Sequence, residues 1–157
     1  MKITKNSINT TKILKFAFLS GIFLVLLACA EDQNAQKNIK KIDGRWYSAD
    51  QVVLGKSVYE VNCISCHLEN AKGTKEWKKT LDDGSYPPPP LNGTAHAWHH
   101  SIEVLLTVIN QGGIPNGGKM PAFKNKLSQD QKIAVVAYFQ SFWPEDIYNK
   151  WESSQKH

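Results

Sequence analysis

Apolar residues in the second half of the chain recur at the three- and four-residue spacing that is typical of helices with one buried face. The clearest pattern covers 101–110, where Ser101 can cap the first turn. Its apolar stripe consists of Ile102, Leu105, Leu106 and Ile109. A second pattern starts at a capping box over 128–131 and runs to about Phe142, because Pro144 cannot continue a helix. Both segments are therefore predicted to be amphipathic helices.

Two further helices are predicted nearer the start of the chain. Ser48 and Asp50 offer N-caps before a helix over 51–62, and a weaker helix covers 72–80. The first has apolar positions at Val52, Leu54, Val58 and Val61. Four consecutive prolines at 87–90 cannot lie inside a helix. Since no segment alternates between apolar and polar residues as a strand does, the predicted fold class is all-α, with about three to five helices.

The first 28 residues resemble a bacterial lipoprotein signal peptide. They carry four lysines and no acidic residue, and their apolar run over 16–27 is shorter than a confident membrane span. The run ends with Ala28 followed by Cys29, the pattern at which lipid is attached and the signal is cleaved. The alternative is an ordinary secretory signal, or an uncleaved anchor, with an incidental cysteine.

Composition divides the rest of the chain. Residues 29–44 are polar and lack apolar periodicity, so they are predicted to tether a lipidated Cys29 flexibly to one domain over 45–157.

The whole chain carries 19 basic and 14 acidic residues, hence a net charge of +5. Removal of residues 1–28 takes away four lysines, which leaves 15 basic against 14 acidic residues and a net charge of +1. The basic balance is therefore no indication of nucleic-acid binding.

The chain contains one Cys-x-x-Cys-His sequence, at Cys63, Cys66 and His67. This spacing is typical of covalent c-type haem attachment, because two thiols on one side of a helical turn can add to the vinyl groups while the adjacent histidine binds the iron. A redox-active dithiol or half of a zinc site also uses Cys-x-x-Cys. The immediate histidine, and the absence of a second cysteine pair, count against both of these sites and favour haem. Because the Cys-x-x-Cys-His sequence occurs once, one haem is expected. Export agrees with this, since bacteria attach c-type haem outside the cytoplasmic membrane.

With these features, the chain over 48–143 resembles a class I, monohaem cytochrome c. The resemblance rests on four pieces in the family's order, which are Gly55-x-x-x-Tyr59, Cys63-x-x-Cys66-His67, Pro89-Pro90-Leu91, and Met120-Pro121-Ala122-Phe123 before a helix with Val136-Ala137-Tyr138. It implies one covalently attached haem c. It also implies that the first and last helices cross at nearly right angles, with close approach at Gly55 and with Tyr59 packed against Tyr138 and Val135.

Met120 is the candidate second axial ligand of the haem iron, together with His67. Removal of the signal leaves Met120 as the only methionine, and it stands in a Gly- and Pro-rich loop that offers no helix face to bury it. A thioether suits low-spin haem iron and raises its reduction potential. The alternative is a loop methionine that packs on the domain. The resemblance also implies that the Pro89 carbonyl accepts a hydrogen bond from His67, unless the proline run is only an extended spacer.

The segment 92–100 holds His96, His99 and His100 around Trp98. Three interpretations stay open. The segment is a loop with solvated histidines, or His96 or Trp98 bonds a haem propionate, or the histidines form a copper or other metal site. One of them could also replace Met120 on the iron.

The resemblance implies a one-electron carrier in a respiratory chain rather than an enzyme, anchored through Cys29 on the periplasmic side of a membrane. Its partners would be redox proteins that donate and accept electrons, and a monomer is expected. Lysines within 72–79 and 119–126 either form a docking surface for an acidic partner or a solvated face. Two alternatives are kept: a haem-based sensor or accessory haem enzyme with a displaceable Met120, and a metal-handling protein that uses 96–100.

Overall fold

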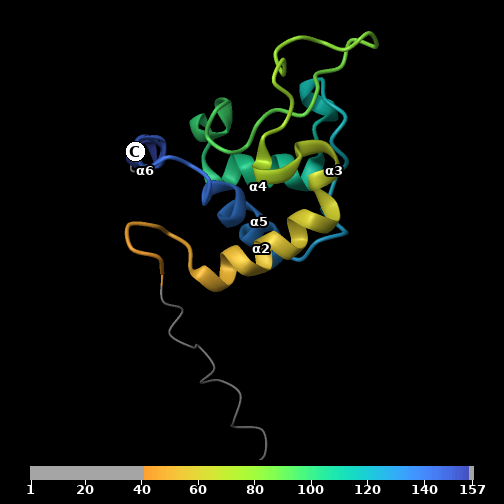
Figure 1. Ribbon diagram of the computed structural model, residues 1–157. Coiled ribbons are helices and arrows are strands. Elements are labelled where there is room, and N and C mark those ends of the chain that lie inside the picture. The colour runs from red at the N-terminus through yellow and green to blue at the C-terminus, as the bar shows by residue number, and fades with distance from the viewer. Residues whose placement is uncertain (1–40, 156–157) are drawn as a thin grey trace, which may run out of the picture. The chain divides into compact units, whose positions relative to one another are not determined.

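Residues 41–155 are described by the computed structural model, and their regular secondary structure is helical. The elements are α2 (Ala49–Asn62), α3 (Ile64–His67), η1 (Glu69–Ala71), η2 (His96–His99), α4 (Ile102–Gln111), η3 (Ile114–Asn116), α5 (Gln129–Gln140) and α6 (Glu145–Ser154), where η marks a 3-10 helix. Strand-like pairing in this part of the chain is limited to two isolated bridges. The all-α fold class is therefore confirmed (Figure 1). The signal over 1–28 and Cys29 lie outside the described residues.

The centre of the fold is the contact between α2 and α5, which cross each other in Figure 1. At Gly55 the two helices approach backbone to backbone, because a Cβ placed there would lie 2.0 Å from the carbonyl oxygen of Ala134 and 2.8 Å from Cβ of Tyr138. One turn later the Tyr59 ring packs against Tyr138, with ring centroids 5.1 Å apart. The predicted packing of Gly55 and Tyr59 is thus confirmed, and such close approach needs a residue without a side chain.

Capping boxes define where both crossing helices begin. The Ser48 hydroxyl accepts a hydrogen bond from the Gln51 N–H at 3.1 Å, and the Gln51 side-chain oxygen accepts one from the Ser48 N–H at 2.9 Å. Ser128 and Gln131 repeat this arrangement at the start of α5. The Ser101 hydroxyl caps α4. These helix starts lie within two residues of their predicted positions, because each is determined by groups three residues apart.

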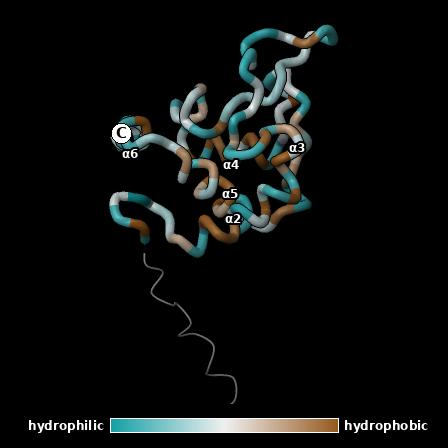
Figure 2. Tube along the Cα trace, in the orientation of Figure 1, coloured by the Kyte–Doolittle hydropathy of each residue, from teal (hydrophilic) through white to brown (hydrophobic). Residues whose placement is uncertain are grey.

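Two details of the predicted pattern are wrong. Residues 72–80 form turns rather than a helix, and they belong to a loop that projects from the helices in Figure 1. Lysines interrupt this stretch and its one large apolar side chain is Trp77, so a helix here would have no apolar face to bury. Figure 2 shows most of the loop as hydrophilic. On α2, Val61 is 80% exposed, because the buried face of that helix runs through Gly55 and Tyr59 instead.

Helix α6 is a finding that the pattern did not predict. Pro144 follows the end of α5, as expected, but it is also the N-cap residue of α6, with a φ of −52° that proline favours. The Trp151 indole donates to the His100 carbonyl at 2.9 Å, and the Trp46 N–H donates to the Tyr148 hydroxyl at 3.0 Å. Helix α6 therefore joins the segment before α2 to the segment around η2. None of the described helices is long and apolar enough to cross a membrane.

Candidate haem site

A single helical turn presents the two thiols of the Cys-x-x-Cys-His motif. Helix α2 leads directly into α3, since the N–H of Cys63 still donates to the Tyr59 carbonyl at 2.8 Å. The N–H groups of Cys66 and His67 then both donate to the Cys63 carbonyl, at 3.1 and 2.9 Å. Both cysteines are free, with Cys63 half-buried and Cys66 exposed. This turn keeps the two thiols and the imidazole within one short segment, which is what double attachment of one haem requires.

The surroundings of Cys63 argue against a redox-active dithiol. Burial, and secondarily the neighbouring Cys66, raise the pKa of the Cys63 thiol to about 11, although Lys126 acts in the opposite direction. Reactive dithiols need a lowered pKa that yields a thiolate at neutral pH. Among the described residues, no three His, Cys, Asp or Glu side chains come together in a way that could hold a metal ion. The zinc interpretation has no support from this part of the chain, and covalent attachment fits the two thiols best.

His67 has the surroundings of an iron ligand. The residue is 8% exposed, and its Nδ1 lies 3.0 Å from the carbonyl oxygen of Pro89. Because a carbonyl can only accept, we assign the proton to Nδ1, which leaves the lone pair of Nε2 for a metal. Burial lowers the pKa of His67, and the bond to Pro89 opposes this only in part. The neutral imidazole, which is the metal-binding form, is therefore favoured at neutral pH.

Backbone hydrogen bonds hold the turn after His67 against the proline run. The N–H of Gly73 donates to the His67 carbonyl, and the N–H of Thr74 donates to the Pro88 carbonyl, both at 2.8 Å. Gly73 has a φ of +55°, and a Cβ on it would lie 2.4 Å from the carbonyl carbon and oxygen of Pro89. The glycine thus leaves the space in which the Pro89 carbonyl approaches His67.

Three residues between His67 and Gly73 adopt left-handed backbone conformations that are uncommon outside glycine. They are Leu68, Asn70 and Ala71, with φ of 62°, 54° and 55°. The Tyr59 hydroxyl donates to the Leu68 carbonyl at 2.8 Å, and burial raises the pKa of Tyr59, so this donor stays protonated. Such backbone strain persists where surrounding contacts over-determine the conformation, and it clusters at functional sites.

Met120 lies on a loop that is bonded back to the end of α4. Its carbonyl accepts a hydrogen bond from the N–H of Gly113 at 2.9 Å. Gly112 has a φ of +83°, and a Cβ on it would lie 2.5 Å from the Met120 carbonyl oxygen, so this approach also needs a glycine. Met120 is half-buried and packs against the same hydrophobic core as Cys63. The structure therefore brings the candidate attachment and axial residues to the edge of one core.

The histidine-rich segment is engaged with aromatic rings. His96 stacks on Trp77, with ring centroids 4.6 Å apart and planes at 23°, and meets His100 edge-on at 5.3 Å. Trp98 stacks on His99 at 3.7 Å. Partial burial, then the two neighbouring histidines and a lysine, lower the pKa of His96. In the described part of the chain these histidines form no metal-holding group, so the metal-site interpretation is not supported. A propionate contact from His96 or Trp98 stays a prediction.

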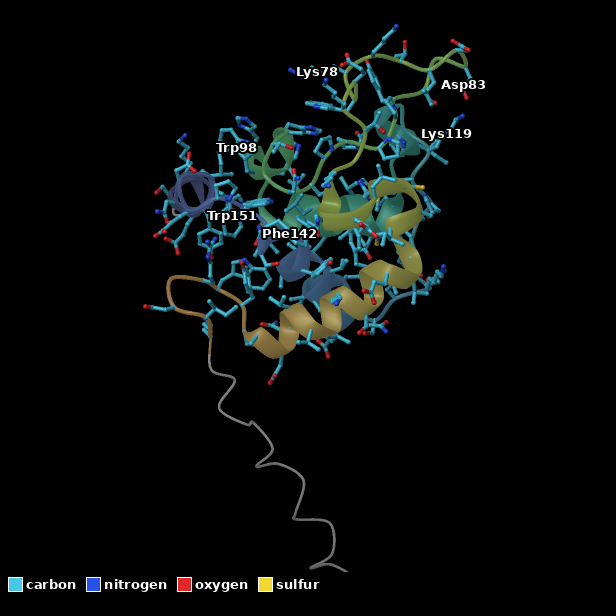
Figure 3. The ribbon with its side chains drawn as sticks, viewed as in Figure 1. Lys78, Asp83, Trp98, Lys119, Phe142 and Trp151 are labelled. Carbon is cyan, nitrogen blue, oxygen red and sulfur yellow. The ribbon has the colours of Figure 1, made fainter. Side chains whose placement is uncertain are left out.

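The end of the projecting loop is attached to the loop of Met120, which the sequence pattern did not indicate. The Asp83 carboxylate accepts hydrogen bonds from the N–H and hydroxyl of Ser85 and pairs with Lys119 (Figure 3). Lys119, and then Ser85, hold the pKa of Asp83 well below its usual range. The N–H of Tyr86 also donates to the Gly117 carbonyl at 2.8 Å. Lys119 is thus paired with a carboxylate of the projecting loop, although both side chains are still exposed to solvent.

Comparison with known proteins points in the same direction. A family model described as cytochrome C oxidase, cbb3-type, subunit III, matches residues 50–139. The cbb3-type cytochrome c oxidase subunit CcoP of Rhodobacter capsulatus is 29% identical over 124 residues, covering 74% of this chain and 37% of that protein. Subunit FixP of Sinorhizobium medicae is 30% identical over 94 residues, covering 57% and 29%. Cytochrome c6 of Leptolyngbya boryana is 32% identical over 90 residues, covering 57% of this chain and 89% of that protein.

The matches cover different shares of the relatives' lengths. The chain spans about a third of the length of the two oxidase subunits, but nearly all of the cytochrome c6. No solved structure matches significantly. The matched region contains every candidate site residue named above except Cys29.

Proposed function

Because the chain belongs to the family of cytochrome c oxidase, cbb3-type, subunit III, we propose that it is a class I, monohaem cytochrome c that carries single electrons in a respiratory chain. The observation that carries this proposal is the hydrogen bond between Nδ1 of the buried His67 and the Pro89 carbonyl, next to two thiols on one helical turn. This bond leaves Nε2 as a ligand atom and fixes the plane of the ring.

Each site residue then has a role. One covalently bound haem c supplies an iron that exists in two oxidation states. The thiols of Cys63 and Cys66 would hold the haem covalently, and Nε2 of His67 and Sδ of Met120 would bind its iron. The Pro89 carbonyl orients the imidazole and makes it a more basic ligand. Because two side chains would bind the iron, the site would be suited to passing electrons rather than to binding a substrate at the metal.

The comparisons support an electron-carrying role, since the matched relatives include a cytochrome c6, two subunits of cbb3-type cytochrome c oxidases and the cytochrome c subunit of a quinone alcohol dehydrogenase. The proposed donor and acceptor are accordingly redox proteins. A haem-based sensor or accessory enzyme would need Met120 to leave the iron. The bonds that tie its loop to α4 favour a ligand that stays in place.

The proposal includes a membrane anchor. The lysine-rich start, the apolar run and the Ala28-Cys29 pair support removal of residues 1–28 and attachment of lipid to Cys29 on the periplasmic side. The polar segment 29–44 then tethers one monomeric domain over 45–157.

The purified full-length product is expected to have a mass equal to the chain from Cys29 onward plus lipid and one haem. A redox titration is expected to follow a single one-electron curve, with about 59 mV per tenfold change in the ratio of oxidised to reduced protein. Two haems or a high-spin resting protein that binds peroxide would contradict the carrier, and the latter would favour the sensor or enzyme. A mass that lacks the lipid would contradict the proposed membrane anchor but not the proposed electron carrier.

Electron transfer to an acidic partner is expected to slow with added salt, because the projecting loop exposes four lysines. They are Lys72, Lys75, Lys78 and Lys79. The double variant Lys75→Glu and Lys79→Glu should reduce the bimolecular rate about tenfold at low salt and flatten its salt dependence. Stopped-flow mixing with the partner measures both effects. Lys150→Glu on α6 is the matched control. Bimolecular rates that do not change with ionic strength would exclude this docking surface.

A further inference from the structure

Trp143 lies beyond residue 139, where the family match ends, and contacts the segment that follows the proline run. It is 3% exposed, and its indole N–H donates to the Leu91 carbonyl at 2.7 Å. Its ring also lies against Gly93, where an added Cβ would come within 3.3 Å of it. Phe139 and Trp151 pack against the indole, with ring centroids 6.3 and 5.8 Å away. The indole is therefore held in place by neighbours from α5 and α6.

The bond to Leu91 matters because of the residues before it. Prolines have no N–H, so the run 87–90 cannot fix its own position by donating hydrogen bonds. The nearest backbone N–H groups belong to the residues on either side of the run. The N–H of Tyr86 donates to the Gly117 carbonyl, and the N–H of Leu91 donates to the Ala71 carbonyl, both at 2.8 Å. Trp143 holds the carbonyl of Leu91 as well. Leu91, the residue that directly follows the run, is thus held through both its N–H and its carbonyl group.

We propose that Trp143 is a positioning residue for His67: by holding Leu91, it keeps the Pro89 carbonyl within hydrogen-bonding distance of Nδ1. The inference rests on the proposed function, in which His67 binds haem iron. Pro89 is two residues from Leu91 and accepts from His67 at 3.0 Å. This bond makes the imidazole a more basic ligand, which stabilises the more oxidised iron. The segment after residue 139 therefore tunes the reduction potential although it supplies no ligand.

The test is Trp143→Phe in the full-length, haem-loaded protein, because phenylalanine keeps an aromatic ring but loses the N–H. We expect hydrogen exchange at the Leu91 amide to accelerate about tenfold or more, beyond any change in global stability. We also expect the reduction potential to rise. At a fixed applied potential the ratio of reduced to oxidised protein should increase about three- to tenfold, where tenfold corresponds to about 59 mV for one electron.

Trp151→Phe is the matched control. Trp151 is also 3% exposed and belongs to the same aromatic cluster, and its indole N–H donates to the His100 carbonyl at 2.9 Å. Its loss should lower Tm to a similar extent, because a comparable buried hydrogen bond is removed. Phenylalanine keeps an aromatic ring against Trp143, so exchange at Leu91 and the reduction potential should stay at their wild-type values.

Three results overturn the proposal. One is an unchanged potential and exchange rate in Trp143→Phe, and another is equal changes in both variants, which would reflect general loosening. The third is faster exchange at Leu91 with an unchanged potential, because the effect would then stop short of His67. Failure of the proposed function is seen separately in the wild type, as absence of covalent haem or of a one-electron titration. In that case the exchange rate of the His67 Nδ1 proton, measured by NMR, still decides whether Trp143 positions Pro89.

Discussion

In the Met120→Ala variant, the ferric protein is expected to become high-spin and to lose the weak far-red absorption band of thioether-ligated haem. Alanine offers no ligand atom, so the position of the thioether would be filled by water or left empty. The reduction potential should fall by about 100 mV or more, because methionine ligation raises haem potentials and axial ligands set them over a range of about 0.8 V. Absorption spectra of both oxidation states and a redox titration measure these changes.

The control for Met120→Ala lies in the same loop. Ile114 is 73% exposed, so Ile114→Ala should leave the spectrum and the potential unchanged. A wild-type protein that is already high-spin would show an open site. A low-spin spectrum that survives in Met120→Ala would identify another ligand, and His96, which stacks on Trp77, would be the next residue to replace.

Gly55→Ala is expected to lower the free energy of unfolding by about 3 kcal/mol or more, because the new methyl group would overlap the backbone of α5. The added Cβ would lie 2.0 Å from the Ala134 carbonyl oxygen, which belongs to the backbone and cannot move aside alone. In an open helix the same substitution would stabilise by about 1 kcal/mol. The sign of the change therefore reports the close approach itself, and thermal unfolding should show a Tm lower by about 10 °C.

Ser57→Ala provides the comparison for Gly55→Ala on the same helix. Ser57 is exposed, and its hydroxyl donates a 3.4 Å hydrogen bond to the Val53 carbonyl of the same helix. Its replacement should change the free energy of unfolding by about 0.5 kcal/mol or less. If both variants unfold at the same temperature, α2 and α5 do not meet at Gly55 as described.

Features that depend on neighbours in the chain could be predicted from the sequence. The capping boxes at Ser48 and Ser128 are formed by groups three residues apart, so they mark helix starts without help from the rest of the fold. The turn that carries Cys63, Cys66 and His67 is likewise local. For that reason the all-α class, the α2 and α5 helices and the composition of the candidate site were open to prediction, while haem binding by that site is still a prediction.

Features that depend on distant partners were decided by the tertiary structure alone. Trp143 and Leu91 are 52 residues apart, and Trp151 and His100 are 51 apart, so no periodicity links them. The stacking of His96 on Trp77 has the same origin, since it joins η2 to a loop that was predicted to be a helix. A pattern of apolar positions shows that a face will be buried, but not what buries it. The sequence by itself thus determined α2, α4, α5 and the Cys-x-x-Cys-His motif, and the tertiary structure determined which distant backbone and side-chain groups hold the proline run beside His67.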